Sequence, residues 1–67
     1  MKTKIPELRR AHKLSQDELA RAVGVTRQTI TSLETEKYTA SLVLAWRIAR
    51  HFNLTIEDIF DFSEEEF

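Results

Sequence analysis

The strongest indication of the fold in this 67-residue chain is the segment from Gln16 to Thr35, QDELARAVGVTRQTITSLET. Its apolar residues predict two short helices that bury their inner faces. Ala20 is small where these helices would cross, and Gly24 follows the first helix at a place where a left-handed residue ends a helix without strain. The stretch therefore predicts two helices joined by a tight turn, with the second helix held rigidly outward.

Capping residues mark the beginning of both helices. Ser15 precedes Glu18 by three residues, the spacing of a capping box, and Thr26 is placed to cap the second helix. That second helix, over about residues 26–35, has an apolar face formed by Ile30 and Leu33. Its other face is polar without being acidic, and it consists of Arg27, Gln28, Thr31 and Ser32.

Apolar residues at helical spacing predict one helix before this pair and one after it. The first contains Ile5, Leu8 and Ala11 and ends near Lys13, with Pro6 in its first turn. The later helix is entered through Thr39 or Ser41 and ends at Asn53 or Leu54. Its expected buried face consists of Leu42, Ala45, Ile48, Ala49 and Phe52.

Thr55 and Asp58 have capping-box spacing and predict a fifth, short helix. The sequence therefore predicts an all-α, five-helix domain. Beyond it, residues 61–67 form an acidic C-terminal tail that is either an added edge strand, hence a short terminal β element, or a frayed end.

Composition restricts the class of protein. A chain of 67 residues supports a single domain, 1–67, with one modest core. The absence of cysteine excludes disulfides and thiolate metal sites. The longest apolar run, Leu42 to Trp46, is too short to cross a bilayer, and no signal peptide is evident, so we expect a cytoplasmic protein without membrane contact.

Charge is distributed unevenly along the chain. The net charge is -1, but residues 1–52 carry all 10 Lys and Arg against 5 acids, whereas residues 53–67 carry 6 acids and no base. This asymmetry predicts a basic working surface, with the acidic tail held elsewhere.

These patterns resemble the lambda-repressor/Cro-like (Xre-type) helix-turn-helix transcriptional regulators. The resemblance covers essentially the whole chain, through residues 14–20, 25–30, 33–34, 37–38, 41–42, 48–49 and 56–60. It implies a five-helix domain that binds double-stranded DNA as a homodimer, with the helix over residues 26–35 in the major groove.

The resemblance also implies roles for individual residues. It assigns base reading to Arg27, Gln28, Thr31 and Ser32, and the chemistry suits this role because Arg pairs with guanine and Gln with adenine. It assigns phosphate contacts to the helix starts and to the loop after the reading helix, namely Gln16, Thr26, Lys37, Tyr38, Thr39 and Ser41. It further implies an internal salt bridge between Arg9 and Glu34, which we interpret as architecture.

Two positions depart from the family pattern. The family often has Asn-Gly after the reading helix, whereas this chain has Thr35-Glu36. The change removes a residue that tolerates positive φ and adds a negative charge near the path of the phosphates. Asn-Pro before the fourth helix is replaced by Thr39-Ala40, so Thr39 is expected to supply the helix cap.

Apolar residues near the end of the chain predict a homodimer interface, and the alternative is that the aromatic ones fold back on their own core. The predicted interface residues are Ile56, Ile59, Phe60 and Phe62. The predicted function is a sequence-specific repressor acting on a pseudopalindromic operator. The alternatives are a DNA-binding antitoxin of a toxin-antitoxin pair, or a protein-interaction module that keeps the fold without binding DNA.

No nucleophile, base and orienting group stand together in the sequence, and no phosphate-binding glycine loop is present. His12 and His51 are isolated from other metal ligands. We therefore expect no catalysis, metal, cofactor or small-molecule ligand.

Overall fold

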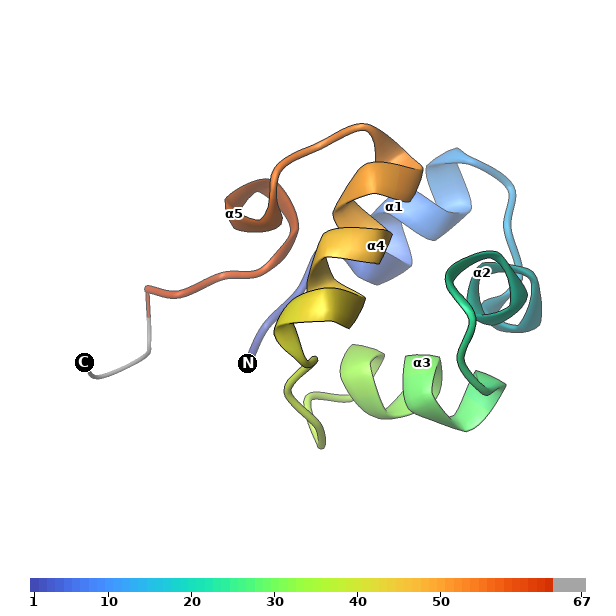
Figure 1. Cartoon of the computed structure of the whole chain (residues 1–67), viewed down its shortest axis with the longest axis horizontal. Coiled ribbons are helices and arrows are strands. Elements are labelled where there is room, and N and C mark those ends of the chain that lie inside the picture. Colours follow the sequence, from blue (N-terminus) through green and yellow to red (C-terminus); the bar gives the residue numbers. More distant parts are fainter. Residues whose placement is uncertain (64–67) are drawn as a thin grey trace.

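The structure, a computed structural model, describes residues 1–63 of the chain. Its helices, in chain order, are α1 (Ile5–Ala11), α2 (Gln16–Val23), α3 (Arg27–Glu34), α4 (Leu42–Phe52) and α5 (Ile56–Ile59). The predicted all-α architecture of five helices is confirmed (Figure 1).

Local capping defines both ends of α2 and the start of α3. The Ser15 hydroxyl accepts a hydrogen bond from the Glu18 amide at 3.0 Å, and the Ser15 amide donates to the Glu18 carboxylate at 2.9 Å. Gly24 ends α2 with φ of 78°, and the Thr26 hydroxyl accepts from the Thr29 amide to begin α3. These three predictions are confirmed, because each depends on residues within one helical turn.

The last two helices also begin at polar residues, and α4 ends at one. Ser41 caps α4, accepting from the Leu44 amide at 3.2 Å, so the expectation that Thr39 supplies this cap is wrong. Ser41 takes the role because it directly precedes the first helical residue and has an extended backbone. Asn53 ends α4 in the left-handed conformation, and a capping box of Thr55 and Asp58 begins α5.

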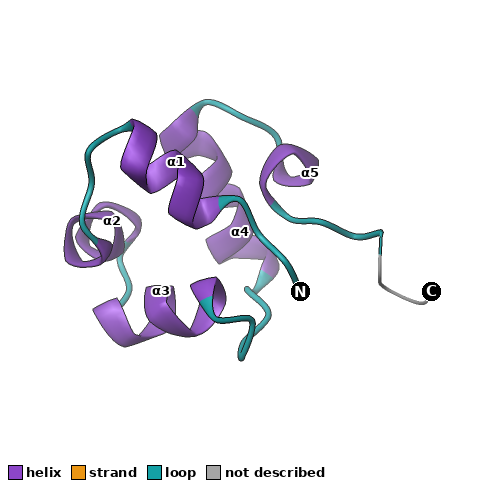
Figure 2. Cartoon of the chain, turned by 180° about the vertical axis from the view of Figure 1, so that it is seen from behind, coloured by secondary structure: helices purple, strands orange, loops and turns teal. Residues whose placement is uncertain are grey.

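The segment after α5 runs beside the N-terminus (Figure 2). Thr3 and Phe60 form an isolated antiparallel bridge, the Lys4 amide donates to the Ile59 carbonyl at 2.8 Å, and the Asp61 amide donates to the Lys2 carbonyl at 2.9 Å. Within residues 1–63 the predicted terminal β element is limited to this bridge. Residues 64–67 of the predicted acidic tail lie outside the described residues.

All five helices contribute to one core. Ala20 is 1% exposed, and its small side chain lets α2 and α3 cross closely. Leu42 was expected in the core but is 78% exposed, because it lies in the first turn of α4 at the edge of that helix's buried face. The buried residues are Ile5, Leu19, Ala20, Val23, Ile30, Leu33, Leu44, Ala45, Ile48, Ala49, Phe52, Ile59 and Phe60.

Across the part of the chain that is described, none of the helices has both the length and the apolar character required to cross a bilayer.

Candidate nucleic-acid interface

Helix α3 lies along one edge of the molecule, and both views leave its outer side uncovered (Figures 1 and 2). On its inner side, Ile30 and Leu33 are at most 1% exposed, so packing against the core fixes the orientation of the helix. The predicted base-reading residues stand on its remaining surface. Arg27 and Gln28 are exposed, and Thr31 and Ser32 are partly exposed.

A shallow hollow lies beside α3. Gln28 and Ser32, both predicted to read bases, line it together with Thr26 and Tyr38, both predicted to contact phosphate, and with Thr29. The hollow therefore presents hydroxyl and amide groups beside an aromatic ring. The structure thus brings the start of α3 and the loop after it together on one face.

The loop between α3 and α4 lies at the same edge of the molecule (Figure 1). Its sequence contains further polar residues. Lys37, Tyr38, Thr39 and Ser41 are all exposed. The Ser41 oxygen accepts the hydrogen bond that caps α4, which leaves the hydroxyl proton free to donate to a phosphate.

Glu36 adopts φ of 63° in this loop. The sequence predicts that losing the family's glycine removes a residue tolerant of positive φ. The structure shows instead that the chain keeps the left-handed turn and places a glutamate in it. The amide of Lys37 donates to the Ser32 carbonyl at 2.9 Å and closes the end of α3, so the turn is retained despite the less suitable residue.

Arg9 and Glu34 form an ion pair that ties α1 to the end of α3. Arg9 Nε lies 2.7 Å from Glu34 Oε2, Nη2 lies 3.1 Å from Oε1, and Nη1 donates to the Leu14 carbonyl at 2.9 Å. The two side chains are only 17% and 8% exposed. Burial alone raises the pKa of Glu34, but hydrogen bonds from Arg9 and Gln16 and the Arg9 charge outweigh it and hold that pKa below its ordinary value.

Gln16 also joins this pair, a contact that the sequence does not predict. Its Nε2 donates to Glu34 Oε1 at 3.0 Å, and its Oε1 accepts from Arg27 Nε at 3.3 Å and from Thr31 Oγ1 at 3.1 Å. These partners stand 11 to 18 residues away in the chain, so no local pattern indicates them. The side chain predicted to hold a phosphate is therefore already in contact with two predicted base-reading residues.

The residues predicted for the dimer interface do not share one environment. Ile59 and Phe60 are 1% and 3% exposed, so the prediction is wrong for these two because their side chains are already buried in the monomer core. Ile56 is half-buried and Phe62 is 38% exposed. An apolar groove lies between the N-terminus, the start of α4 and α5, and it is lined partly by Leu42, Ile56 and Phe62.

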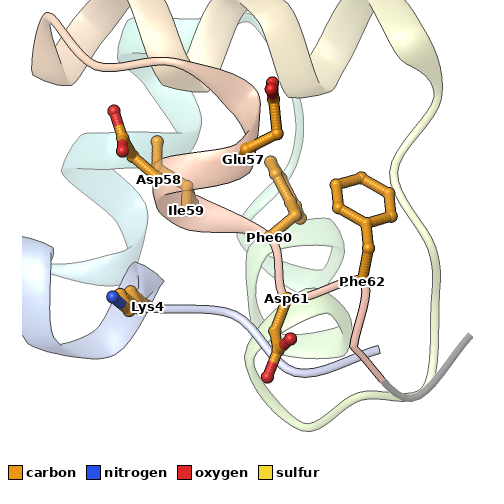
Figure 3. A pocket seen from close by; sticks show the side chains of 7 residues that line it. All are labelled: Lys4, Glu57, Asp58, Ile59, Phe60, Asp61 and Phe62. Atoms are coloured by element: carbon orange, nitrogen blue, oxygen red, sulfur yellow. The ribbon is translucent and has the colours of Figure 1, made fainter.

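Another hollow lies beside α5 and the segment after it. It is lined by Lys4, Glu57, Asp58, Ile59, Phe60, Asp61 and Phe62. Figure 3 shows that the three carboxylates point in different directions. Among residues 1–63, no three His, Asp or Glu side chains are placed to hold a metal ion. The acidic lining does not suit a polyanion. The α3 face carries the exposed polar residues predicted to contact DNA, and it is therefore the candidate nucleic-acid interface.

Comparison with known proteins gives three kinds of match. A helix-turn-helix family matches residues 5–59. An uncharacterized HTH-type transcriptional regulator of Archaeoglobus fulgidus is 56% identical over 66 residues, covering 98% of this chain and 93% of that protein. The uncharacterized HTH-type transcriptional regulator YgzD of Bacillus subtilis is 45% identical over 65 residues, with 97% and 98% covered.

A solved structure is also similar. The restriction-modification controller protein C.AhdI from Aeromonas hydrophila superimposes with a TM-score of 0.78 and 30% sequence identity, over 85% of this chain and 86% of that one.

Proposed function

Because the chain belongs to the lambda-repressor/Xre-like helix-turn-helix family of transcriptional regulators, we propose that it binds double-stranded DNA sequence-specifically and represses transcription by occupying a promoter. The observation that carries this proposal is the position of α3. Its apolar side is locked into the core, and Arg27 and Gln28 are exposed. The helix itself runs along an uncovered edge of the molecule (Figure 1). A rigid, polar helix of this kind fits the major groove of B-DNA.

In this proposal two groups of residues have different tasks. Arg27 and Gln28 carry most of the base recognition, because a guanidinium pairs bidentately with guanine and a side-chain amide with adenine. Thr31 and Ser32 complete the base-reading surface. Gln16, Thr26, Lys37, Tyr38, Thr39 and Ser41 hold the phosphates and set the register of the helix in the groove.

We further propose that the protein acts as a homodimer. Two copies related by a two-fold axis would present their α3 helices about 34 Å apart, which matches successive major grooves and a pseudopalindromic operator. The apolar groove lined by Leu42, Ile56 and Phe62 supports an interface there, since it leaves large apolar side chains open to a second copy.

Selection of bound sequences from a random DNA pool tests the proposal and yields the half-site spacing in the same experiment. The selected operator is then titrated at several salt concentrations. For a DNA-binding protein, the logarithm of the binding constant falls linearly with the logarithm of the salt concentration, and each phosphate neutralised contributes about -0.9 to the slope. No binding at low salt would contradict the proposal and favour the protein-interaction module, an alternative that the exposed acid at Glu36 supports. Co-purification of a toxin encoded by a neighbouring gene would instead identify an antitoxin.

Two substitutions assign the roles of the residues. Arg27→Ala should weaken operator binding by about 1–3 kcal/mol and relax the preference at one base pair, with nonspecific binding largely kept. Lys37→Ala should weaken binding to every sequence alike and reduce the salt slope by about 1. An equal loss on every sequence for Arg27→Ala would contradict its reading role, and an unchanged slope would remove Lys37 from the phosphate contacts.

A further inference from the structure

The outer side of α4 carries an exposed tryptophan within a strip of apolar and basic residues. One side of this helix is turned into the core, and the residues on the opposite side are exposed: Val43, Trp46, Arg47 and Arg50. They follow one another at spacings of three or four residues, so their side chains are neighbours on the helix surface. Trp46 is 54% exposed and Val43 is 58% exposed, which leaves a large apolar area open on this helix.

A shallow hollow lies between this strip and the end of α2. Residues 21–24 line it from α2 and the turn after it, and Trp46, Arg47, Arg50 and His51 line it from α4. A Cβ atom built on Gly24 would lie 3.5 Å from Arg47 Nη1, so the Arg47 guanidinium reaches from α4 to the turn between α2 and α3. We call the exposed strip on α4, together with Arg21, the Trp46 surface.

The Trp46 surface is positively charged. It contains three arginines, and no acid lines the hollow. Arg21 pairs with Asp17 at 2.8 Å, whereas Arg47 and Arg50 have no carboxylate partner within residues 1–63. Two guanidinium groups therefore stand beside Trp46 without a compensating negative charge.

Arg50 and Trp46 contact each other before any partner binds. Arg50 Cζ lies 5.3 Å from the centre of the Trp46 ring, which is a cation–π distance. The contact restricts two long side chains that both remain exposed, and it therefore reduces the rotamer entropy that binding would otherwise remove. Tryptophan and arginine are also the residue types that most often dominate the binding energy of protein interfaces.

We propose that the Trp46 surface binds an acidic segment of a partner protein, whose carboxylates pair with Arg47 and Arg50 and whose apolar side chain packs on Trp46 and Val43. This inference goes beyond the proposed DNA binding and does not depend on it. It gives a small domain a second surface through which another protein can act on it.

The chemistry of the surface favours a peptide segment over a phosphate-bearing ligand. A guanidinium binds carboxylates and phosphates alike, through two parallel hydrogen bonds. Val43, however, extends the apolar area from Trp46 toward the start of α4, and a phosphate group offers nothing to cover it. The hollow is also too open for a small molecule, because such ligands bury most of their surface in a pocket. An acidic segment that carries an apolar side chain complements both parts of the surface.

The Trp46 surface is separate from the two surfaces discussed above. The hollow at Trp46 shares no lining residue with the hollow beside α3 or with the apolar groove beside α5. Figure 1 shows α4 running from the loop after α3 toward the opposite side of the molecule, so its last turns lie away from the α3 edge. A partner on this surface therefore leaves the polar side of α3 open.

The experiment selects peptides from a random displayed library with the full-length protein as bait. An enriched peptide that lacks tryptophan is then labelled with a dye, and its affinity is measured by fluorescence anisotropy. Trp46 is the only tryptophan of the chain, so its emission reports directly on this surface. The variants are Trp46→Ala, Arg47→Gln and Arg50→Gln, each checked by circular dichroism. Arg10→Gln is the matched control, because it removes the same charge from an exposed position on α1, which lies behind α4 in Figure 1.

We expect the enriched peptides to be rich in Asp and Glu, with an aliphatic or aromatic residue among the acids. Their binding should shift the Trp46 emission to shorter wavelength, because the ring leaves water. Arg47→Gln and Arg50→Gln should each weaken binding roughly tenfold, as for the loss of one hydrogen bond between charged groups. Trp46→Ala should weaken it about 30-fold, as for a central interface residue, and Arg10→Gln should leave it unchanged.

Four results would overturn the inference. The first is enrichment of no peptides, or of neutral or basic ones, and the second is equal affinity for the Trp46→Ala variant and the unsubstituted protein. The third is short-wavelength Trp46 emission without peptide, which would show that the chain covers this surface itself, through a second copy or its own acidic end. The fourth is a shift of that emission on adding operator DNA, with a smaller salt slope for Arg50→Gln, which would make the surface a DNA contact. None of the first three results bears on base reading by α3, so this inference and the proposed function fail separately.

Discussion

Replacing Arg9 by methionine tests how strongly the fold depends on its largely buried ion pair. The chain provides an internal comparison, because Arg21 and Asp17 form a second ion pair of nearly the same length. The shortest N–O distances are 2.7 Å for Arg9–Glu34 and 2.8 Å for Arg21–Asp17. The side chains of the first pair are 17% and 8% exposed, and those of the second are 80% and 50% exposed. Burial, rather than distance, therefore separates the two pairs.

The expected loss of stability follows from this burial. Arg9→Met keeps most of the apolar stem but leaves the Glu34 carboxylate with Gln16 as its remaining hydrogen-bond partner in the network, and it removes the bond to the Leu14 carbonyl. Breaking a buried pair costs about 3–5 kcal/mol and breaking an exposed pair at most about 1. Since Arg9 keeps some exposure, we expect a loss of about 2–4 kcal/mol. A domain of this size has a total stability of roughly 3–10 kcal/mol, so the melting temperature should fall by about 10–30 °C.

Thermal and urea unfolding, followed by circular dichroism, measure the difference. Arg21→Met, as the matched control, should cost no more than about 0.5 kcal/mol. Combining Arg9→Met with Glu34→Met should recover most of the lost stability, because replacing both members of a buried pair by apolar groups is often close to neutral. A loss of stability for Arg9→Met no larger than that for Arg21→Met would contradict this expectation, as would a double variant as unstable as the sum of its single substitutions.

Three further predictions concern the pH dependence, the turn after α3 and the apolar surface. The pKa of Glu34 in the folded protein lies below its ordinary value of 4.5. The ionised carboxylate therefore contributes its full stabilisation above pH 4.5, and this contribution is lost as the pH falls through the lower pKa of the folded state. Glu34→Gln should accordingly flatten the acid limb of a plot of unfolding free energy against pH. Glu36→Gly should stabilise the domain by about 0.5–1 kcal/mol in urea unfolding, because φ of 63° suits glycine, whereas Thr35→Gly, at φ of -93°, should destabilise it. Phe62→Asp should shift the sedimentation of a dimer to that of a folded monomer, and a dimer that survives this substitution would place the interface elsewhere. Ile59→Asp should instead unfold the chain, because it buries a charge in the core.

Much of the fold is predictable from the sequence because its signals are local. Ser15, Gly24, Thr26 and Asn53 each act within one turn of the helix that they begin or end. The periodicity of apolar residues likewise predicts that Ile30 and Leu33 face the core, which turns the polar side of α3 outward. The location of the candidate interface follows from these local signals.

What the side chains contact depends on the tertiary structure, because those contacts join residues far apart in the chain. Nothing near Gln16 in the sequence indicates that Glu34 and Arg27 share its amide, since the three meet only when α2 and α3 have crossed. The same limit applies to the apolar residues, for periodicity shows that a helix has a buried face but not how far its neighbours extend over it. Packing therefore decided that Phe60 closes the monomer core, while Leu42, at the edge of its helix's apolar face, remains exposed.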